Sequence, residues 1–457
     1  MSQNVELFQM LEAREKRAWE QQRLLAAFHK PVLCFTMNIP GPVKDTPLVR
    51  RAFFYGIKTL DHRLPKGNVL HRAAHCAVTG CEAMYVVDMD ALSLKKITTA
   101  IEVETPLGRL FDMDVLDEGG HKLDREAVGG GSRDCIVCGA AGRGCASRRS
   151  HSVAELQQAV NRIMTEHFAR DDAKQIGAWA TQSLLDEVCT TPKPGLVDRN
   201  NNGSHRDMDI FTFMASAAAL SPYFQNCAEI GMKSAALAPE ETFRQLRMAG
   251  LRAEQDMFAA TNGVNTHKGA IFTMGILCGA AGRLWSPGET WNVEDLCREV
   301  SAVTKAALEA DFRAGGDTVG QRLHAQRGIP GIRGEVAKGL PSVAKIALPA
   351  YYRCLDNGCD QNEAGAVTLL HLIANVEDTN MLSRGGTEGA SQGAAWAAEL
   401  IRNDRKPSLD EVSELDERFI QRNLSPGGCA DLLAAVYFLA QLTQDRHITK
   451  LGRTENV

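Results

Sequence analysis

Long apolar runs are missing from this chain of 457 residues. No segment contains the roughly 18 to 20 uninterrupted apolar residues that cross a bilayer. The first residues are charged and periodic, without the apolar region of a secretory signal. Long basic stripes of the kind that bind nucleic acid are also missing, and the formal net charge is −5. We therefore expect neither a membrane protein nor a nucleic-acid-binding protein.

Recognised nucleotide-binding fingerprints are missing as well, since the chain has neither a P-loop nor a Rossmann glycine pattern. Its 13 cysteines are odd in number and scattered. That distribution favours free thiols in a reducing compartment over a disulfide framework, so we expect a cytoplasmic protein. A hydrophobic content of 44% with 23% charged residues is typical of a globular protein.

The chain is long enough for two domains, and its pattern changes near residue 150. The N-terminal part mixes helical and alternating patterns, whereas the remainder is helical between glycine- and asparagine-rich loops. Residues 1–168 contain 22 basic and 20 acidic residues, a net +2, and the remainder contains 29 and 36, a net −7. We predict a multidomain protein, with an N-terminal α+β domain (1–168) followed by an all-α helical domain (172–457).

Local patterns predict the elements of the N-terminal domain. Helices are expected within residues 1–30 and 48–60, and strands at the following segments: 31–39, 83–89, 95–104 and 110–116. The strand at 95–104 is inferred from the alternation of Ile97, Thr99, Ile101 and Val103 with more polar residues.

The triplet Asp-Met-Asp occurs three times, at 88–90, 112–114 and 207–209. Asp90 most simply caps a following helical turn. Asp112 and Asp114 lie in a predicted strand, where residues two apart share a face. Two adjacent carboxylates repel unless a cation lies between them, and Mg²⁺ with a polyphosphate is the usual solution. This pattern predicts nucleotidyl or phosphoryl transfer, with Glu102 or Glu104 as a third carboxylate and Arg109 for a phosphate.

A cysteine-rich segment follows. Cys135 and Cys138 form a CxxC pair, with Cys145 and His151 beyond it. These residues could form a Cys3His zinc site, but a second CxxC is missing, and plain buried thiols are the preferred interpretation. Arginines in and around the segment favour an anionic ligand or an acidic protein partner: Arg133, Arg148 and Arg149.

The C-terminal part has five polar, glycine-containing loops between helical segments, at 191–209, 263–269, 331–335, 377–386 and 425–431. We expect these loops to line one site. In the first loop, Asp207 or Asp209 could be only a helix cap, but one aspartate suffices for that. In the second, His267 and Lys268 would place two cations at a helix N-terminus, which is tolerated where an anion binds. The candidate residues are Lys193, Asn202, His205, Asp207, Asp209, His267, Lys268, Arg333, Glu377, Asp378 and Arg384.

These motifs carry a resemblance to known families. Residues 1 to about 168 resemble the apo-citrate lyase phosphoribosyl-dephospho-CoA transferases through "PGPVKD", "GRLFDMDVLD", "RDCIVC" and "CASRRSH". Residues from about 172 onward resemble the triphosphoribosyl-dephospho-CoA synthases through "TPKPGLVDRNNNGSHRDMD", "GVNTHKGAIF", "GIRGE", "EDTNMLSRGG" and "SPGG".

The resemblance implies a fused bifunctional transferase with a nucleotidyltransferase-like N-terminal domain. ATP and 3′-dephospho-CoA would give triphosphoribosyl-dephospho-CoA and adenine. Phosphoribosyl-dephospho-CoA would then pass to a serine of the citrate lyase acyl carrier (gamma) subunit, with release of pyrophosphate. The alternatives are the equivalent enzymes of malonate decarboxylase and a non-catalytic, zinc-binding assembly factor.

The resemblance also suggests roles for the candidate residues. Mg²⁺ would be held by Asp112 and Asp114 in the first domain, where Arg109 would stabilise charge, and by Asp207 or Asp209 in the second. Glu377 or Asp378 would act as a base, with His205 also in the catalytic set. Phosphate binding would fall to the cationic residues Lys193, His267, Lys268, Arg333 and Arg384, with Asn202 beside them, and Arg133 and Arg148 would serve the first domain.

Overall fold

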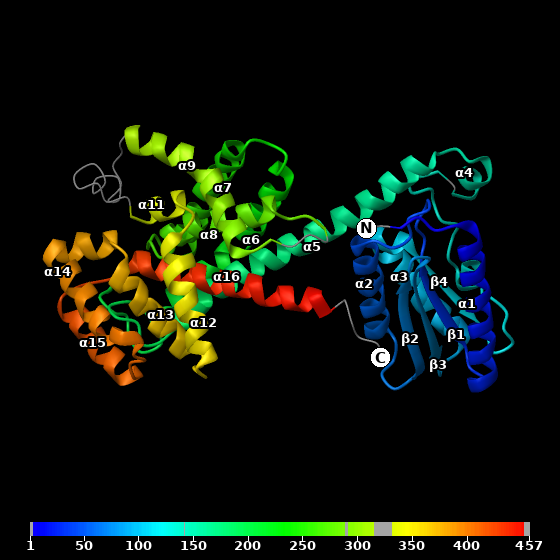
Figure 1. The fold of residues 1–457 in the computed structure, drawn as a ribbon, viewed down its shortest axis with the longest axis horizontal. Helices are drawn as coiled ribbons and strands as arrows, with labels where there is room; N and C mark the ends of the chain where they lie inside the picture. Colours follow the sequence, from blue (N-terminus) through cyan, green and yellow to red (C-terminus); the bar gives the residue numbers. More distant parts are fainter. Residues whose placement is uncertain (1–2, 141, 288–290, 315–330, 452–457) are drawn as a thin grey trace. The chain divides into compact units, whose positions relative to one another are not determined.

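A computed structural model describes residues 3–140, 142–287, 291–314 and 331–451 of the chain. Its contacts divide the chain into two units, and the division falls between Ala169 and Arg170 (Figure 1). The first unit contains a small antiparallel sheet with helices, and the described part of the second unit is helical. The predicted order of an α/β-containing part followed by a helical part is confirmed at this level.

The sheet of the first unit has four antiparallel strands in the order β2-β3-β1-β4. Its strands are β1 (Val32–Met37), β2 (Val69–Ala77), β3 (Gly80–Val87) and β4 (Phe111–Leu116). The predicted strands at 31–39, 83–89 and 110–116 are therefore confirmed. Strand β2 was not predicted, because "VLHRAAHCA" has few β-branched or aromatic residues, and its pairing with β3 determines its conformation.

Helices cover both faces of this sheet (Figure 1). On one face, Leu24 and Leu25 of α1 (Leu7–Phe28) pack against Cys34 and its neighbours. On the other face, Phe53 of α2 (Pro47–Arg63) stacks on Phe35, with ring centroids 5.0 Å apart. The remaining short elements are the helix α4 (Gly142–Arg148) and the 3-10 turns η1 (Pro106–Leu110) and η2 (Arg125–Val128).

The prediction of a strand at 95–104 is wrong, because this segment belongs to helix α3 (Ala91–Glu104). Asp90 caps the helix, as predicted, and accepts a hydrogen bond from the backbone N–H of Ser93 at 2.8 Å. The buried residues Leu94, Thr98 and Ile101 recur at helical spacing. The sequence contains this pattern and the alternating one together, and the cap favours the helix.

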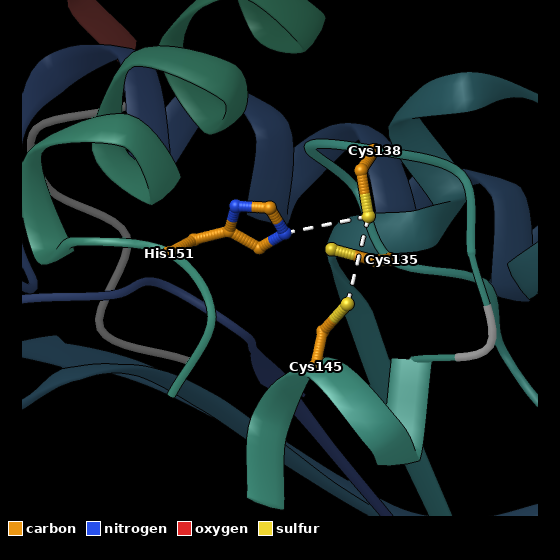
Figure 2. A group of neighbouring side chains, drawn as sticks. All are labelled: Cys135, Cys138, Cys145 and His151. Atoms are coloured by element: carbon orange, nitrogen blue, oxygen red, sulfur yellow. Dashed lines mark hydrogen bonds between the residues drawn. The ribbon is translucent and has the colours of Figure 1, made fainter. Parts of the chain in front are cut away.

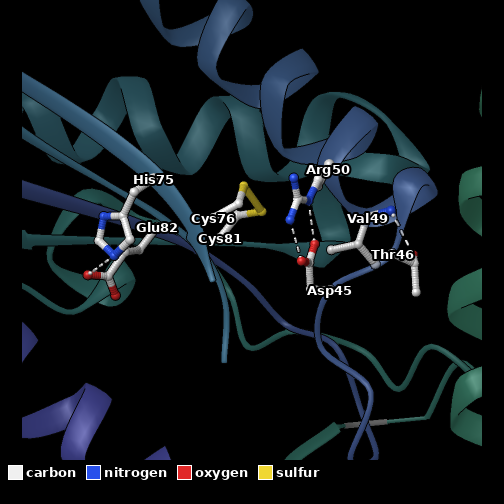
Figure 3. The surroundings of a disulfide bond; sticks show 8 residues. All are labelled: Asp45, Thr46, Val49, Arg50, His75, Cys76, Cys81 and Glu82. Carbon is white, nitrogen blue, oxygen red and sulfur yellow. Dashed lines mark hydrogen bonds and ion pairs between the residues drawn. A yellow bond between two sulfur atoms is a disulfide. The ribbon is translucent and has the colours of Figure 1, made fainter. Parts of the chain in front are cut away.

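One pair of cysteines departs from the free-thiol prediction. Cys76 in β2 and Cys81 in β3 form a disulfide across the hairpin (Figure 3). Eleven other cysteines are free thiols. Near the disulfide, Asp45 pairs with Arg50 at 2.5 Å, and the Thr46 hydroxyl accepts from the backbone of Val49 at 3.1 Å, which caps α2.

The second unit is built from helices around one hydrophobic core. The helix α5 (Val153–Cys189) starts in the first unit and contains the boundary between the two. The further helices are α6 (Ile210–Ser234), α7 (Pro239–Ala260), α8 (Lys268–Arg283), α9 (Val293–Ala314), α11 (Gly331–Ala337), α12 (Leu348–Asp356), α13 (Gln361–Asn375), α14 (Thr379–Leu400), α15 (Leu409–Gln421) and α16 (Gly427–Leu451), with a π-helical turn η3 (Val343–Ala347) before α12 and a 3-10 turn η4 (Arg402–Asp404) after α14.

Helix α8 lies in the centre of this core, and most of its residues are buried. Small residues allow its backbone to approach α6 closely, since a methyl group on Gly231 would collide with the Gly279 carbonyl. Among the described residues, no helix is both long and apolar enough to cross a membrane. The central position of α8 fixes its N-terminus at the cavity described below.

Candidate functional site

The aspartate pair of the first unit has the geometry that the strand pattern predicts. Asp112 and Asp114 are half-buried on one face of β4, and Phe111, Met113 and Val115 are buried on the other. Asp114 pairs with Lys122 at 2.6 Å. Burial and the neighbouring Asp114 raise the pKa of the Asp112 carboxyl. The pair therefore lies where a divalent cation would relieve repulsion.

The outer edge of β4 is closed by two side chains from α3. The buried Lys95 ammonium donates to the Met113 carbonyl at 3.1 Å, and the Met113 N–H donates to the Glu102 carboxylate at 2.9 Å. The expectation that Glu102 or Glu104 adds a third carboxylate from a paired strand is wrong. Glu102 also accepts from Arg133 at 2.5 Å, and Glu104 pairs with Arg63 at 2.7 Å.

The candidate arginines of the first unit differ in their surroundings. Arg109 donates to the backbone carbonyl of Asp134, and burial lowers the pKa of its guanidinium, with Arg133 and Arg125 adding to the effect. Arg133 is held by Glu102, whereas Arg148 is exposed at the end of α4, where it donates to the Gly144 carbonyl at 3.1 Å. Arg109 and Arg133 thus belong to the surroundings of the aspartate pair.

The four residues of the cysteine-rich segment come together (Figure 2). We call them the cysteine–histidine cluster: Cys135, Cys138, Cys145 and His151. One ligand atom from each lies within 4.8 Å of all the others. The preferred sequence interpretation, plain buried thiols, is wrong, since Cys138 is exposed and the other two thiols are only partly buried. Backbone N–H groups of Cys138 and Val137 lower the pKa of the Cys135 thiol to about 7.

The second unit contains a cavity of about 660 Å³. All five loops selected from the sequence contribute to its lining, so the prediction that they meet at one site is confirmed. Seven of the candidate residues line it: Lys193, His205, Asp207, His267, Lys268, Arg333 and Arg384. The following paragraphs describe how the fold holds these groups.

The first loop is ordered by buried carboxylates. Asp198 accepts from the backbone N–H groups of Lys193, Asn200 and Asn201 at 2.7 to 3.0 Å. Asp416 of α15 accepts from the Gly195 N–H at 2.7 Å, and Gly195 has a left-handed φ of 71°. These contacts place the Lys193 side chain at the cavity.

Three long helices begin at the cavity. Its lining includes first-turn residues of α8, α14 and α16, among them Gly269, Asn380 and Gly428. Each helix N-terminus carries a partial positive charge, although Asp378 already accepts from N–H groups in the first turns of α14 and α16. Together with Lys268 and Arg384, the three termini make part of the cavity strongly attractive to a polyanion.

Three buried polar atoms at the cavity lack a hydrogen-bond partner. They are Nε2 of His267, Oγ1 of Thr266 and Nη1 of Arg333. The nearest carboxylate recorded for Arg333 Nη1 is Asp311, at 3.9 Å. Because buried polar groups are normally paired, these atoms indicate that a polar ligand completes the site.

His267 is not the cation that the sequence analysis expected. Helix α8 begins at Lys268, so His267 is its N-cap residue, and its Nδ1 lies 2.7 Å from the Ser216 hydroxyl. Burial, with the nearby Lys193 ammonium, lowers the pKa of His267 to about 3. The imidazole is therefore neutral near neutral pH, and the expected pair of cations reduces to Lys268, which pairs with Glu254 at 2.8 Å.

His205 is held between two partners. Its Nδ1 accepts from the Arg384 guanidinium at 3.2 Å, and its Nε2 lies 2.9 Å from the Ser425 hydroxyl. Because arginine can only donate, the ring proton lies on Nε2 and points at Ser425. Burial and the Arg384 charge lower the pKa of His205. This geometry is better suited to a residue that orients Ser425 than to a general base.

Carboxyl groups also line the cavity: Glu187, Asp207, Glu254 and Asp431. Glu187 forms a buried ion pair with Lys193. Burial raises the pKa of the Asp431 carboxyl well above its usual value, and the charges of Glu187 and Asp378 raise it further. Asp431 can therefore hold a proton near neutral pH.

Four candidate residues do not line the cavity. Asn202 and Glu377 are exposed. Asp209 caps α6, with one carboxylate oxygen bonded to the backbone and hydroxyl of Thr212 at 2.8 and 2.7 Å. Asp378 is a buried cap of α14 that also accepts from the Cys429 N–H at 2.9 Å. The structure thus gives Asp209 and Asp378 structural contacts and does not bring Glu377 to the site.

The candidate set drawn from the sequence lacked several lining residues, chiefly Glu187 and Glu254. These two lie inside helices α5 and α7, where an acidic residue resembles any solvated position. Asp431, in contrast, belongs to the last of the five loops, after the Gly427–Gly428 pair, and the sequence therefore indicated it.

Carboxylates that could bind Mg²⁺ are present at both sites. Asp112 and Asp114 offer two carboxylates on one strand face. In the cavity, Asp207 and Glu254 are available. Among the described residues, neither site brings three metal-ligating side chains together; only the cysteine–histidine cluster does so. Mg²⁺ commonly uses one or two carboxylates with substrate phosphates, so both sites fit it in that mode.

Comparison with known families matches two models along the chain. Residues 5–167 match the family described as apo-citrate lyase phosphoribosyl-dephospho-CoA transferase, and residues 173–450 match ATP:dephospho-CoA triphosphoribosyl transferase.

Full-length relatives have the same order. Protein CitXG of Leuconostoc mesenteroides subsp. cremoris is 35% identical over 96% of this chain and 98% of its own length. Protein CitXG of Haemophilus influenzae is 34% identical over 95% of this chain and 96% of its own. The 2-(5''-triphosphoribosyl)-3'-dephosphocoenzyme-A synthase of Pectobacterium atrosepticum is 41% identical over 62% of this chain and 95% of its own.

Proposed function

Because this chain belongs to the family that fuses an apo-citrate lyase phosphoribosyl-dephospho-CoA transferase to an ATP:dephospho-CoA triphosphoribosyl transferase, we propose how its two units divide the work. Residues 172–457 make the activated prosthetic group, and residues 1–168 attach it. The observation that carries the first assignment is the cavity that three helix N-termini line together with cationic and carboxyl side chains.

The synthesis is a displacement at the ribose of ATP. The 2′-hydroxyl of 3′-dephospho-CoA attacks the anomeric carbon, the bond from that carbon to adenine breaks, and adenine leaves. The hydroxyl proton passes to an ionised carboxylate, for which Asp207 and Glu254 are placed, and the adenine gains a proton. The products are triphosphoribosyl-dephospho-CoA and free adenine.

Each part of the cavity has a role in this reaction. The helix N-termini, with Lys268, Arg333 and Arg384, bind the triphosphate, and Asp207 would hold Mg²⁺, which would supply further positive charge to it. Asp431 is the general acid, because its raised pKa keeps a proton available for the leaving purine. Glu187 lies nearby in its ion pair with Lys193, which opposes the rise that burial causes in the pKa of this carboxyl, and its carboxylate form would stabilise an oxocarbenium-like transition state.

The attachment step uses the aspartate pair of the first unit as a nucleotidyltransferase-like site. A serine hydroxyl of the acyl carrier subunit of citrate lyase attacks the phosphate next to the ribose, and the bond to pyrophosphate breaks. Asp112 and Asp114 would hold Mg²⁺, which would stabilise the negative charge of a departing pyrophosphate, and Arg109 offsets the developing charge. The exposed Arg148 and Arg149 provide a docking surface for an acidic carrier.

The test uses the full chain with ATP, 3′-dephospho-CoA and Mg²⁺. We expect adenine release that requires dephospho-CoA. When apo-acyl carrier subunit is added, we expect its mass to increase by one prosthetic group on serine. Adenine release without dephospho-CoA would contradict the synthesis step. Absence of the mass increase, with adenine release intact, would contradict the attachment step.

The same assay separates the alternatives. A malonate decarboxylase carrier used as the acceptor should be modified poorly, since the matching family and relatives are those of citrate lyase. A non-catalytic assembly factor would release no adenine under any condition.

A further inference from the structure

The segment between β4 and α5 has no hydrophobic core of its own. None of the residues from Asp117 to Ser152 whose burial the structure describes is buried. Among the described residues of this stretch, regular structure is limited to η2, the seven-residue helix α4 and isolated bridges at Lys122 and Asp134. A stretch that buries so little apolar surface needs another source of stability, such as a metal ion.

The cysteine–histidine cluster lies within this segment, and its members come from both ends of a loop of the chain. Cys135 and Cys138 lie at a turn before α4, Cys145 lies in α4, and His151 follows this helix. Cys138 Sγ lies 3.5 Å from Cys145 Sγ and 3.3 Å from His151 Nε2 (Figure 2). Ligands at the usual zinc distances of about 2.0 to 2.3 Å are about 3.4 to 3.8 Å apart in a tetrahedron.

We propose that the cysteine–histidine cluster binds one Zn²⁺ ion and that this ion holds the segment between β4 and α5 in its fold. Three thiolates and an imidazole favour zinc over the oxygen-preferring Mg²⁺ or Ca²⁺. With four protein ligands the coordination is complete, which is typical of a structural site and not of a catalytic one. This zinc is distinct from the Mg²⁺ proposed at the aspartate pair.

The site would also position groups beside the aspartate pair. Cys135 directly follows Arg133 and Asp134. Arg133 pairs with Glu102, which binds the Met113 N–H between the two aspartates, and the Asp134 carbonyl accepts from Arg109. Zinc would therefore fix Arg133 and Asp134 as positioning residues. This consequence for transfer depends on the proposed function, whereas zinc binding does not.

The first experiment measures metal content. The full chain, purified under reducing conditions from zinc-supplemented medium, should contain one zinc per chain. Cys138→Ser and Cys145→Ser should each lose it, and the control Cys297→Ser, in α9 and away from the cluster, should retain it. In the wild-type protein the three cluster thiols should resist alkylation until a chelator is added. A zinc-free protein that also fails to take up added Zn²⁺, or a disulfide between Cys138 and Cys145 under reducing conditions, would overturn the proposal.

Two further measurements show whether the cluster variants are folded and lack only the metal. Adenine release should stay within about twofold of wild type in Cys138→Ser and Cys145→Ser, since it reports on the other unit of the same chain. Replacing the metal with Co²⁺ should give the absorption of a tetrahedral thiolate complex in wild type and in Cys297→Ser but not in the cluster variants. An octahedral Co²⁺ spectrum in wild type would contradict the site.

The transfer assay then separates the two proposals. If the assignment of the first unit is right, loss of zinc should lower transfer to the carrier at least tenfold while adenine release continues. If wild-type protein transfers nothing, the function of the first unit is wrong, and the zinc content still decides the metal site.

Discussion

The two units place carboxyl groups in opposite settings. In the first unit, Asp112 and Asp114 lie side by side on an edge strand, half-exposed, with Lys122 as a counter-charge. In the second, Asp431 is partly buried in a cavity, against Gly269 in the first turn of α8. The pKa of Asp431 is raised further above its usual value than that of Asp112, because desolvation of its carboxyl is reinforced by the charges of Glu187 and Asp378. The first setting suits metal binding, and the second suits proton donation.

This difference also determines what a sequence reveals. A strand repeats every two residues, so a short motif such as Asp-Met-Asp specifies the direction of its own side chains. A cavity between helices collects residues from the whole second unit, from Glu187 to Asp431. The contrast predicts that substitutions in the two units affect separate reactions, and the following experiments test it in order of expected effect.

The largest effect is expected for Asp431→Asn. An amide cannot protonate the departing adenine, so adenine release should fall by about 10² to 10⁴-fold. In wild type the rate should fall as pH rises through the raised pKa of Asp431, because only the protonated form is active. Transfer of prosthetic group supplied as triphosphoribosyl-dephospho-CoA should be unchanged. A near-normal rate of adenine release in the variant would rule out Asp431 as the acid.

The matching change in the first unit is Asp112→Asn. Transfer to the carrier should fall by about 10² to 10³-fold, comparable to the loss of one group that stabilises transition-state charge, with adenine release unchanged. The control is Asp88→Asn, since Asp88 belongs to the same type of triplet but pairs with Lys30 at 2.5 Å on the surface. Equal losses in the two variants would show that the effect is not specific to the aspartate pair.

A smaller effect is expected for Gly269→Ala. A methyl group at this position would overlap the Asp431 carboxylate. The variant should be destabilised by about 1 to 3 kcal/mol, as is typical of overpacking, and should release adenine more slowly. In the control Gly250→Ala, the added methyl group is 3.4 Å from the Tyr223 hydroxyl, and urea unfolding should show little change. Wild-type stability and rate in Gly269→Ala would contradict the close approach of α8 to Asp431.

The last prediction concerns stability alone and rests on His267, whose pKa is about 3 in the folded chain against 6.5 in the unfolded chain. The unfolded state therefore binds an extra proton between these values, and stability is lost as pH falls below about 6.5. Wild type should lose about 1.4 kcal/mol per pH unit more than His267→Asn in this range. Urea unfolding at several pH values measures this, and parallel profiles would show that His267 is not buried and neutral.

Part of the structure could be predicted from the sequence, and the limits have physical causes. The alternation in 111–116 fixed the face of Asp112 and Asp114, and glycine-rich loops identified the cavity. Residues 95–104 were misassigned because their alternation suits a strand, while the cap at Asp90 and the contacts of α3 with β4 favour a helix. Asp378 caps α14 through the N–H groups of Asn380 and Met381, whereas its further bond from the Cys429 N–H joins residues 51 positions apart, which no local pattern records.

The closed edge of β4 limits how a carrier protein could be recognised. Lys95 and Glu102 occupy the outward backbone groups of Met113, and the Val115 carbonyl accepts from the Leu123 N–H at 2.9 Å. An incoming chain therefore finds no free hydrogen-bonding groups at these positions and cannot extend the sheet as an added strand. If the carrier docks along β4, we therefore expect side chains, and not added backbone pairing at Met113 and Val115, to recognise it.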